Sequence, residues 1–178
     1  MVSILVLSIL NVYLELFMLS SKVETRQNCC FIGHREIRES DALIEQLRKE
    51  IINLIKRERV DTFLFGSKSE FNRLCHRIVT ELKNEFPNIK RIYVRAEFPI
   101  ISESYEKYLL ESYEETYFPE KILNSGKAAY VERNYEMINR SDFCIAYYDE
   151  KRKGSSGTRL AYRYALRKRL NVKNLFVD

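Results

Sequence analysis

Small residues suited to holding an anion lie in one short turn near the carboxyl end of the chain. The turn reads Gly154-Ser155-Ser156-Gly157-Thr158. Its glycines permit positive φ and close backbone approach, and its hydroxyl residues suit a helix cap. The first N–H groups of a helix are unpaired and carry a partial positive charge. The turn is therefore predicted to bind a phosphate or another anion, and the alternative is an ordinary helix cap.

Such a turn needs a strand before it and a helix after it. Residues 143–148 form a short apolar run, which is typical of a buried strand. The following helix has its inward face between residues 160 and 165. Its basic stripe is interpreted as a solvated face outside the site: Arg159, Arg163 and Arg167.

Glycine and polar residues also follow two earlier apolar runs, at 29–33 and 60–65. These positions are Gly33, His34, Arg35, Gly66 and Ser67. The carboxyl ends of parallel strands meet at one edge of a sheet, where α/β proteins bind ligands. Arginine suits bidentate contact with phosphate, and a serine hydroxyl can donate to phosphate or ribose. As an alternative, the first pair of polar side chains caps a helix or pairs with Glu36 or Glu39.

Regular alternation of apolar runs and helical periods predicts the elements that position these residues. The remaining predicted elements are helices at 41–59, 71–82 and 127–140 and strands at 89–94 and 175–177. Repeated strand–helix units favour parallel pairing with right-handed crossovers. The sequence therefore predicts a Rossmann-like, three-layer α/β/α fold with a mostly parallel sheet of about five strands.

The alternation lapses between Ala96 and Gly126. This segment carries two prolines, several glutamates and a series of aromatic residues that includes Tyr105, Tyr108, Tyr113, Tyr117 and Phe118. A long aromatic segment between core elements is often a lid or binding loop. The alternative is a pair of surface helices that bury their own tyrosines.

Composition limits the class of protein. The 178 residues are 46% hydrophobic, enough for one well-buried core. Net charge is +5, but nine Lys or Arg and no acid lie between Lys151 and Lys173, whereas seven Glu and one Lys lie between Glu97 and Glu120. This polarity suggests an anionic ligand or an intermolecular contact. Four cysteines without C-x-x-C spacing and two histidines predict neither disulfides nor a metal site.

The first 28 residues are predicted to lie outside the core. Residues 1–19 are apolar without an early basic residue or a clear cleavage site, so a signal peptide is not expected. They are interpreted as an extension, with a membrane anchor as the alternative, and residues 21–28 as a polar linker. The domain is then predicted to span residues 29–178, and the protein to be cytoplasmic unless the extension is an anchor.

Four blocks resemble the SLOG superfamily of Rossmann-like nucleotide-ligand binders, and within it the YpsA-like proteins. They are F-I-G-H-R, F-G-S-K-S-E-F-N-R-L-C, E-R-N-Y-E-M-I-N-R-S-D-F-C-I-A-Y-Y-D and G-S-S-G-T-R-L-A-Y-R-Y-A. The resemblance covers about residues 29–176, and the last two blocks are its specific part. It implies a nucleotide-type ligand.

Enzymatic members of this superfamily, the LOG-type phosphoribohydrolases, carry an Arg before the last block and a Glu shortly after its Gly-Thr turn. Arg133 stands at the matching position, followed by Asn134, but Thr158 is followed by Arg159, Leu160 and Ala161. Hydrolysis of a glycosidic bond needs a carboxylate to activate water or to stabilise the developing cation. The resemblance thus implies a phosphate-binding site without that carboxylate. Arg133 has the alternative of pairing with a glutamate on its own helix.

Three functions remain open. The first is a nucleotide-binding module, a sensor or regulator without catalysis or a cofactor. The second is a LOG-type nucleoside-monophosphate phosphoribohydrolase that uses another carboxylate: Glu36, Asp142 or Asp149. The third is a single-stranded nucleic-acid binder, because the DprA proteins share this superfamily. The acidity of the aromatic segment disfavours nucleic acid as a partner, and a homo-oligomer is left open.

Overall fold

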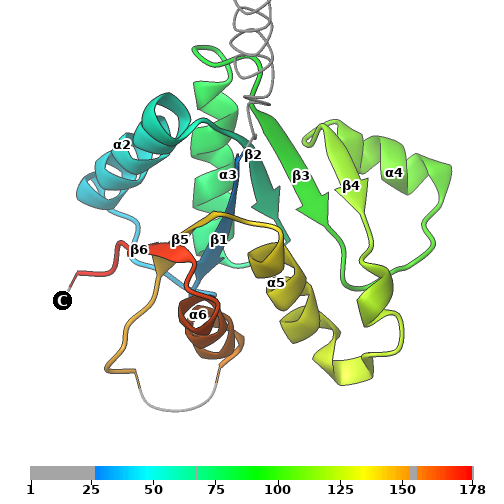
Figure 1. Cartoon of the computed structure of the whole chain (residues 1–178). Helices are drawn as coiled ribbons and strands as arrows, with labels where there is room; N and C mark the ends of the chain where they lie inside the picture. Colours follow the sequence, from blue (N-terminus) through cyan, green and yellow to red (C-terminus); the bar gives the residue numbers. More distant parts are fainter. Residues whose placement is uncertain (1–26, 67, 153–155, 178) are drawn as a thin grey trace, which may run out of the picture.

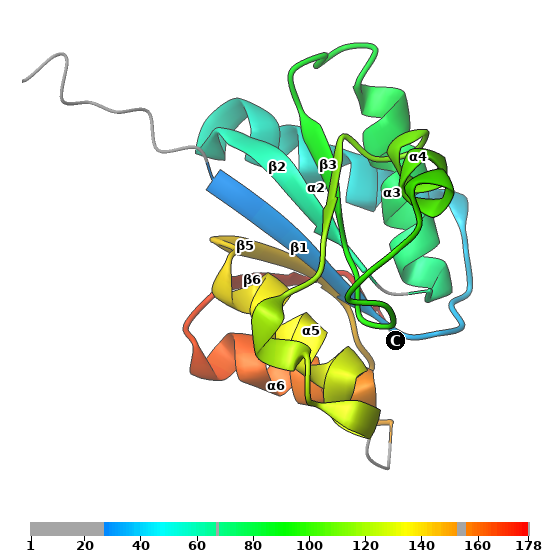
Figure 2. The same cartoon turned by 90° about the vertical axis from the view of Figure 1, so that its right-hand side faces the viewer.

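The computed structural model describes residues 27–66, 68–152 and 156–177. In these ranges it contains one parallel sheet with helices on both faces (Figures 1 and 2). The strands and α-helices are β1 (Gln27–Gly33), α2 (Asp41–Glu58), β2 (Val60–Phe65), α3 (Glu70–Leu82), β3 (Lys90–Val94), α4 (Glu103–Leu110), β4 (Glu115–Tyr117), α5 (Ala129–Asn139), β5 (Phe143–Tyr147), α6 (Gly157–Arg167) and β6 (Asn171–Asn174).

The six strands lie in the order β4-β3-β2-β1-β5-β6, and every neighbouring pair is parallel. The chain runs outward from β1 to β4, then crosses back and places β5 on the other side of β1. Strand order therefore reverses between β1 and β5, and such a switch point is where open α/β sheets bind ligands. The Rossmann-like α/β class is confirmed, with six strands rather than about five.

The sheet separates two buried layers. On β1, Cys29 and Phe31 pack in the layer of α2 and α3, whereas Cys30 and Ile32 pack in the layer of α5 and α6 (Figure 2). Burial on both faces explains the apolar runs of the neighbouring strands β1 and β5. All four cysteines are buried and free.

The sheet differs from the prediction mainly at three strands. β1 begins at Gln27, so two residues of the predicted linker belong to the sheet. The sequence does not predict β4, because its three residues make no apolar run; pairing with β3 creates it. The last strand lies at Asn171–Asn174 instead of 175–177, where a half-exposed edge position accepts the polar sequence N-V-K-N. The predictions for residues 1–26 fall outside the described ranges.

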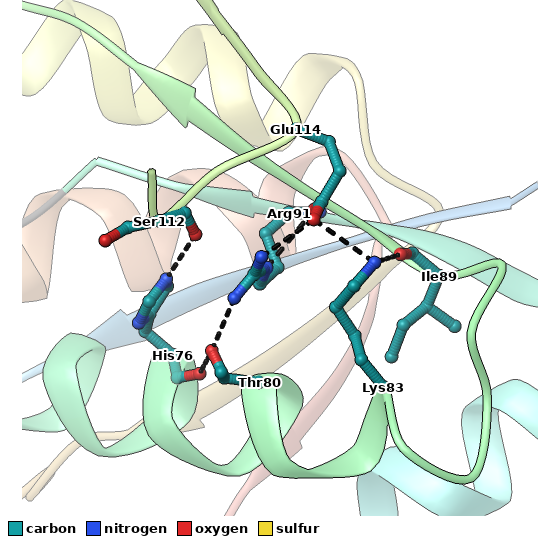
Figure 3. Close-up of polar contacts among 7 residues, drawn as sticks. All are labelled: His76, Thr80, Lys83, Ile89, Arg91, Ser112 and Glu114. Atoms are coloured by element: carbon teal, nitrogen blue, oxygen red, sulfur yellow. Dashed lines mark hydrogen bonds and ion pairs between the residues drawn. The ribbon is translucent and has the colours of Figure 1, made fainter. Parts of the chain in front are cut away.

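A polar network fastens β4 to the neighbouring elements (Figure 3). Glu114, just before β4, accepts hydrogen bonds from the backbone N–H, Nε and Nη2 of Arg91 at 2.6, 3.2 and 2.7 Å. Lys83 Nζ lies 3.1 Å from the same carboxylate. His76 Nε2 lies 3.0 Å from the backbone oxygen of Ser112. The aromatic segment thus contains a helix, α4, and a strand docked on the edge of the sheet.

Helices of the described ranges are too short or too polar to cross a membrane. The anchor alternative concerns residues outside these ranges.

Candidate functional site

A cleft of about 720 Å³ opens beyond the carboxyl end of β1, between the starts of α3 and α6. Eight predicted site residues line it: Gly33, His34, Arg35, Arg133, Asn134, Ser156, Gly157 and Thr158. Gly66 instead lines a smaller recess next to the cleft. The predictions at Ser67, Gly154 and Ser155 fall on residues that the structure does not describe.

Arg133, on α5, is a buried cation in the wall of the cleft. Only 3% of the surface of Arg133 is exposed. Its Nη1 donates to the backbone oxygens of Gly66 and Val94, the latter at 3.0 Å, and its Nε donates to Asn134 Oδ1 at 3.0 Å. Among the described residues, no carboxylate forms an ion pair with it. Burial lowers the pKa of its guanidinium, so a bound anion would stabilise the charged form.

Surface pairing within α5 is therefore not the role of Arg133. One candidate partner, Glu136, is itself buried, and its carboxylate pairs with Arg140 at 2.7 Å. Glu132 is exposed on the same helix. The carbonyls at the ends of β2 and β3 take the place of the expected carboxylate.

Packing, and not backbone angle, requires glycine at Gly33 and Gly66. Among the described glycines, positive φ occurs at Gly126 alone. A Cβ on Gly33 would lie less than 3.0 Å from the Phe71 side chain, and one on Gly66 would lie as close to the Arg133 guanidinium. The two glycines thus allow α3 and α5 to close onto the ends of β1 and β2.

The start of α6 forms another wall. Ser156 is its N-cap, and its Oγ accepts a hydrogen bond from the Arg159 N–H at 3.1 Å. Thr158 Oγ1 donates to the Gly33 backbone oxygen at 3.0 Å, which ties α6 to β1. Gly157 lacks the predicted positive φ, and a Cβ there would meet nothing within 4 Å. Only a ligand that approaches the backbone closely would require glycine at this position.

His34 connects the end of β1 to the loop that follows β5. The residue is 5% exposed, its Nε2 accepts a hydrogen bond from the Asp149 N–H at 2.9 Å, and its ring lies 5.5 Å from that of Tyr148. Burial lowers the pKa of His34 and Arg152 lowers it further, although Asp149 raises it. The neutral ring therefore has Nε2 as its acceptor. The cap of α2 is Ser40, so neither His34 nor Arg35 has that role.

Comparison with known proteins identifies the family. The family model YpsA, which is described as the YspA SLOG family, matches residues 32–177. The chain belongs to the YpsA SLOG family. No curated protein matches the chain.

Two solved structures are similar to this SLOG chain. DNA processing protein A from Helicobacter pylori, whose description concerns its single-stranded DNA binding mode, is 18% identical with a TM-score of 0.51. The match covers 84% of this chain and 65% of the DNA processing protein, so this chain spans less than two thirds of its length. The molybdenum cofactor carrier protein from Chlamydomonas reinhardtii is 13% identical over 83% of this chain and 74% of that one, with a TM-score of 0.49. The expectation that nucleic acid is not a partner draws no support from these matches.

The SLOG domain also places residues in the cleft that the sequence does not single out. They include Lys68, Ser69, Tyr130, Tyr148, Arg152 and Arg159. Two local signals were available: Lys68 and Ser69 directly follow the second glycine turn, and Tyr130 precedes Arg133 by one helical turn. Arg159 belongs to the basic stripe that was interpreted as solvated. Only the fold shows which end of that stripe reaches the cleft.

Three side chains join the cleft to the smaller recess: Lys68, Tyr130 and Arg133. Tyr130 Oη donates to Glu97, and Lys68 Nζ lies 3.1 Å from the same carboxylate. The hydrogen bond from Tyr130, followed by that from Lys68, lowers the pKa of Glu97. The Arg133 guanidinium carbon lies 5.9 Å from the centre of the Tyr130 ring. The wall between cleft and recess is thus a connected polar cluster.

Of the three carboxylates considered for catalysis, Glu36 alone lines the cleft. Asp142 lies before β5 and accepts a hydrogen bond from the Asn28 N–H at 2.9 Å, at the amino end of the sheet. Asp149 accepts one from the Lys151 N–H at 2.8 Å. The last two carboxylates stabilise loops.

Proposed function

We propose that the chain is a nucleotide-binding module that holds a phosphate-bearing, nucleotide-type ligand in the cleft and performs no catalysis. The observation that carries this proposal is Arg133, a buried guanidinium in the cleft wall without an ion pair among the described residues. Burying an unpaired charge costs free energy that a counter-ion offsets. A phosphate group supplies that counter-charge and suits the geometry of arginine.

Two helix starts support an anion at this place. The caps of α3 and α6, Ser69 and Ser156, both line the cleft. The positive ends of two helix dipoles therefore meet the same space. Its volume, about 720 Å³, lies within the usual range for small-molecule sites.

A thermal-shift screen tests this function. We expect AMP, ADP-ribose, NAD or a cyclic dinucleotide to raise the melting temperature, and to raise it further as its concentration increases, because it binds the folded state alone. At 100 times its Kd, a ligand stabilises the fold by about 2.7 kcal/mol. No shift with any of these compounds at millimolar concentration would contradict the proposal.

Matched variants locate the ligand. Arg35→Ala removes an exposed cation from the cleft, whereas Lys49→Ala removes an exposed cation from α2, outside it. We expect the first to weaken binding in calorimetry and the second to leave it unchanged. Equal effects would show that the ligand responds to overall charge and not to this cleft.

Single-stranded nucleic acid is the second candidate, favoured by the charges around the cleft. One carboxylate, Glu36, lines it together with five cations: Arg35, Lys68, Arg133, Arg152 and Arg159. Affinity for a labelled oligothymidylate, measured against salt concentration, tests this candidate. A steep linear fall of log affinity with log salt would indicate contact with several phosphates. Binding that is weak at every salt concentration would exclude it.

A further inference from the structure

Tyr130 presents a large aromatic surface to the cleft. It lies on α5, one turn before Arg133, and is 49% exposed. The same residue lines the cleft and the recess beside it. An exposed ring in the wall of a small-molecule cleft can stack with a planar group of the ligand.

The ring is held in place before any ligand arrives. Its hydroxyl donates to Glu97, which is also paired with Lys68 at 3.1 Å. The guanidinium carbon of Arg133 lies 5.9 Å from the ring centre. A side chain fixed in this way loses little conformational freedom on binding, so stacking on it costs less free energy.

The sizes of the two cavities decide where a base can lie. The recess has a volume of about 10 Å³, which is close to the room that one water molecule needs. It therefore cannot hold a nucleobase, although aromatic residues surround it. The cleft, at about 720 Å³, can. A base must then lie on the cleft side of Tyr130.

We infer that Tyr130 is the stacking platform for the base of a nucleoside phosphate, and thus a specificity residue that separates nucleotides from simpler phosphates. The inference rests on the proposed function. The phosphate lies between Arg133 and the start of α6, and the base lies against Tyr130. Stacking accepts any base, because every base has a π face.

Titration calorimetry with AMP and ribose 5-phosphate tests the inference. We expect Tyr130→Ala to weaken AMP binding about 5- to 150-fold, the usual loss for one base–aromatic stack, and to leave ribose 5-phosphate unchanged. Tyr130→Phe keeps the ring and should stay within about 3-fold of the wild type for AMP. Tyr108→Ala is the matched control, because Tyr108 is a 63% exposed ring on α4 that lines neither cavity.

The outcomes distinguish a failure of this inference from a failure of the proposed function. If ribose 5-phosphate binds as tightly as AMP, or if Tyr130→Ala weakens both alike, the base does not stack on Tyr130. The proposed phosphate-binding function is not affected by that result. Equal loss in Tyr108→Ala would also overturn the platform. If AMP does not bind the wild type but another nucleotide of the thermal-shift screen does, this inference fails alone. If none of those nucleotides binds, the proposed function fails with it.

Discussion

Arg133 serves the fold as well as the cleft, because its Nη1 donates to backbone oxygens at the ends of β2 and β3. Arg133→Ala leaves these buried acceptors without a partner. A lost partner of this kind costs about 1–3 kcal/mol. We therefore expect a loss of that size in the free energy of unfolding, measured by urea denaturation, together with weaker binding of phosphate ligands.

Arg35→Ala is the control for this loss, since it removes an exposed charge from the same cleft. Its free energy of unfolding should stay within about 0.5 kcal/mol of the wild type. If Arg133→Ala is equally mild, the two hydrogen bonds do not stabilise the fold.

Two glycines at the cleft should respond oppositely to alanine. A Cβ on Gly33 collides with Phe71, and overpacking of this kind costs about 1–3 kcal/mol. Gly157 is helical and has open space around its Cα, so Gly157→Ala should raise stability by about 0.4–1 kcal/mol. Urea midpoints of the two variants check this contrast. A destabilised Gly157→Ala protein would mean that glycine is needed there for the fold itself.

Among the elements, β4 depends on the carboxylate that fastens it to β3 and α3 (Figure 3). Glu114→Gln removes the charge that Arg91 and Lys83 share. Hydrogen bonds to charged groups contribute about 1.5–3 kcal/mol each, so we expect a loss of about 2 kcal/mol at neutral pH. Glu115→Gln, at an exposed neighbouring carboxylate, is the matched control.

The pH dependence of this loss follows from the pKa of Glu114. Burial would raise that pKa, but the hydrogen bonds from Arg91 and Lys83 outweigh it and lower the pKa from 4.5 to about 2. The stabilisation is therefore complete above pH 4.5 and is lost as pH falls through about 2. The stability difference between wild type and Glu114→Gln should shrink over that interval. A difference independent of pH would show that the charge is not its cause.

Elements with a strong apolar signal were predictable, and edge elements were not. Val60–Phe65 is a six-residue strand with four apolar residues, and its bounds agree with the sequence prediction. β4 and β6 pair along only one side and carry polar residues, so their periodicity is weak. Only the neighbouring strand determines where such segments pair.

At the scale of the whole molecule, parallel strands explain why much of the cleft could be predicted. Residues after different strands converge at one edge of the sheet. Gly33 and Gly157 therefore line the same cleft although they are 124 positions apart in the sequence. The sequence does not show in the same way which face of each helix is turned toward the cleft. Whether Tyr130 and Arg159 face the cleft depends on how α5 and α6 pack on the sheet, and both were missed.

The same arrangement bears on the proposal that the chain performs no catalysis. Parallel strands place Asp142 at the amino end of β5, opposite the cleft, and leave Glu36 as the carboxylate of the described lining. Glu36 is exposed, whereas the carboxylates of a glycosidase act as a pair that flanks the scissile bond. We therefore expect no release of adenine from AMP, assayed by chromatography at stoichiometric protein concentration. If adenine does appear, Glu36→Gln decides its origin: loss of the activity would establish Glu36 as the replacement carboxylate and overturn the non-catalytic module.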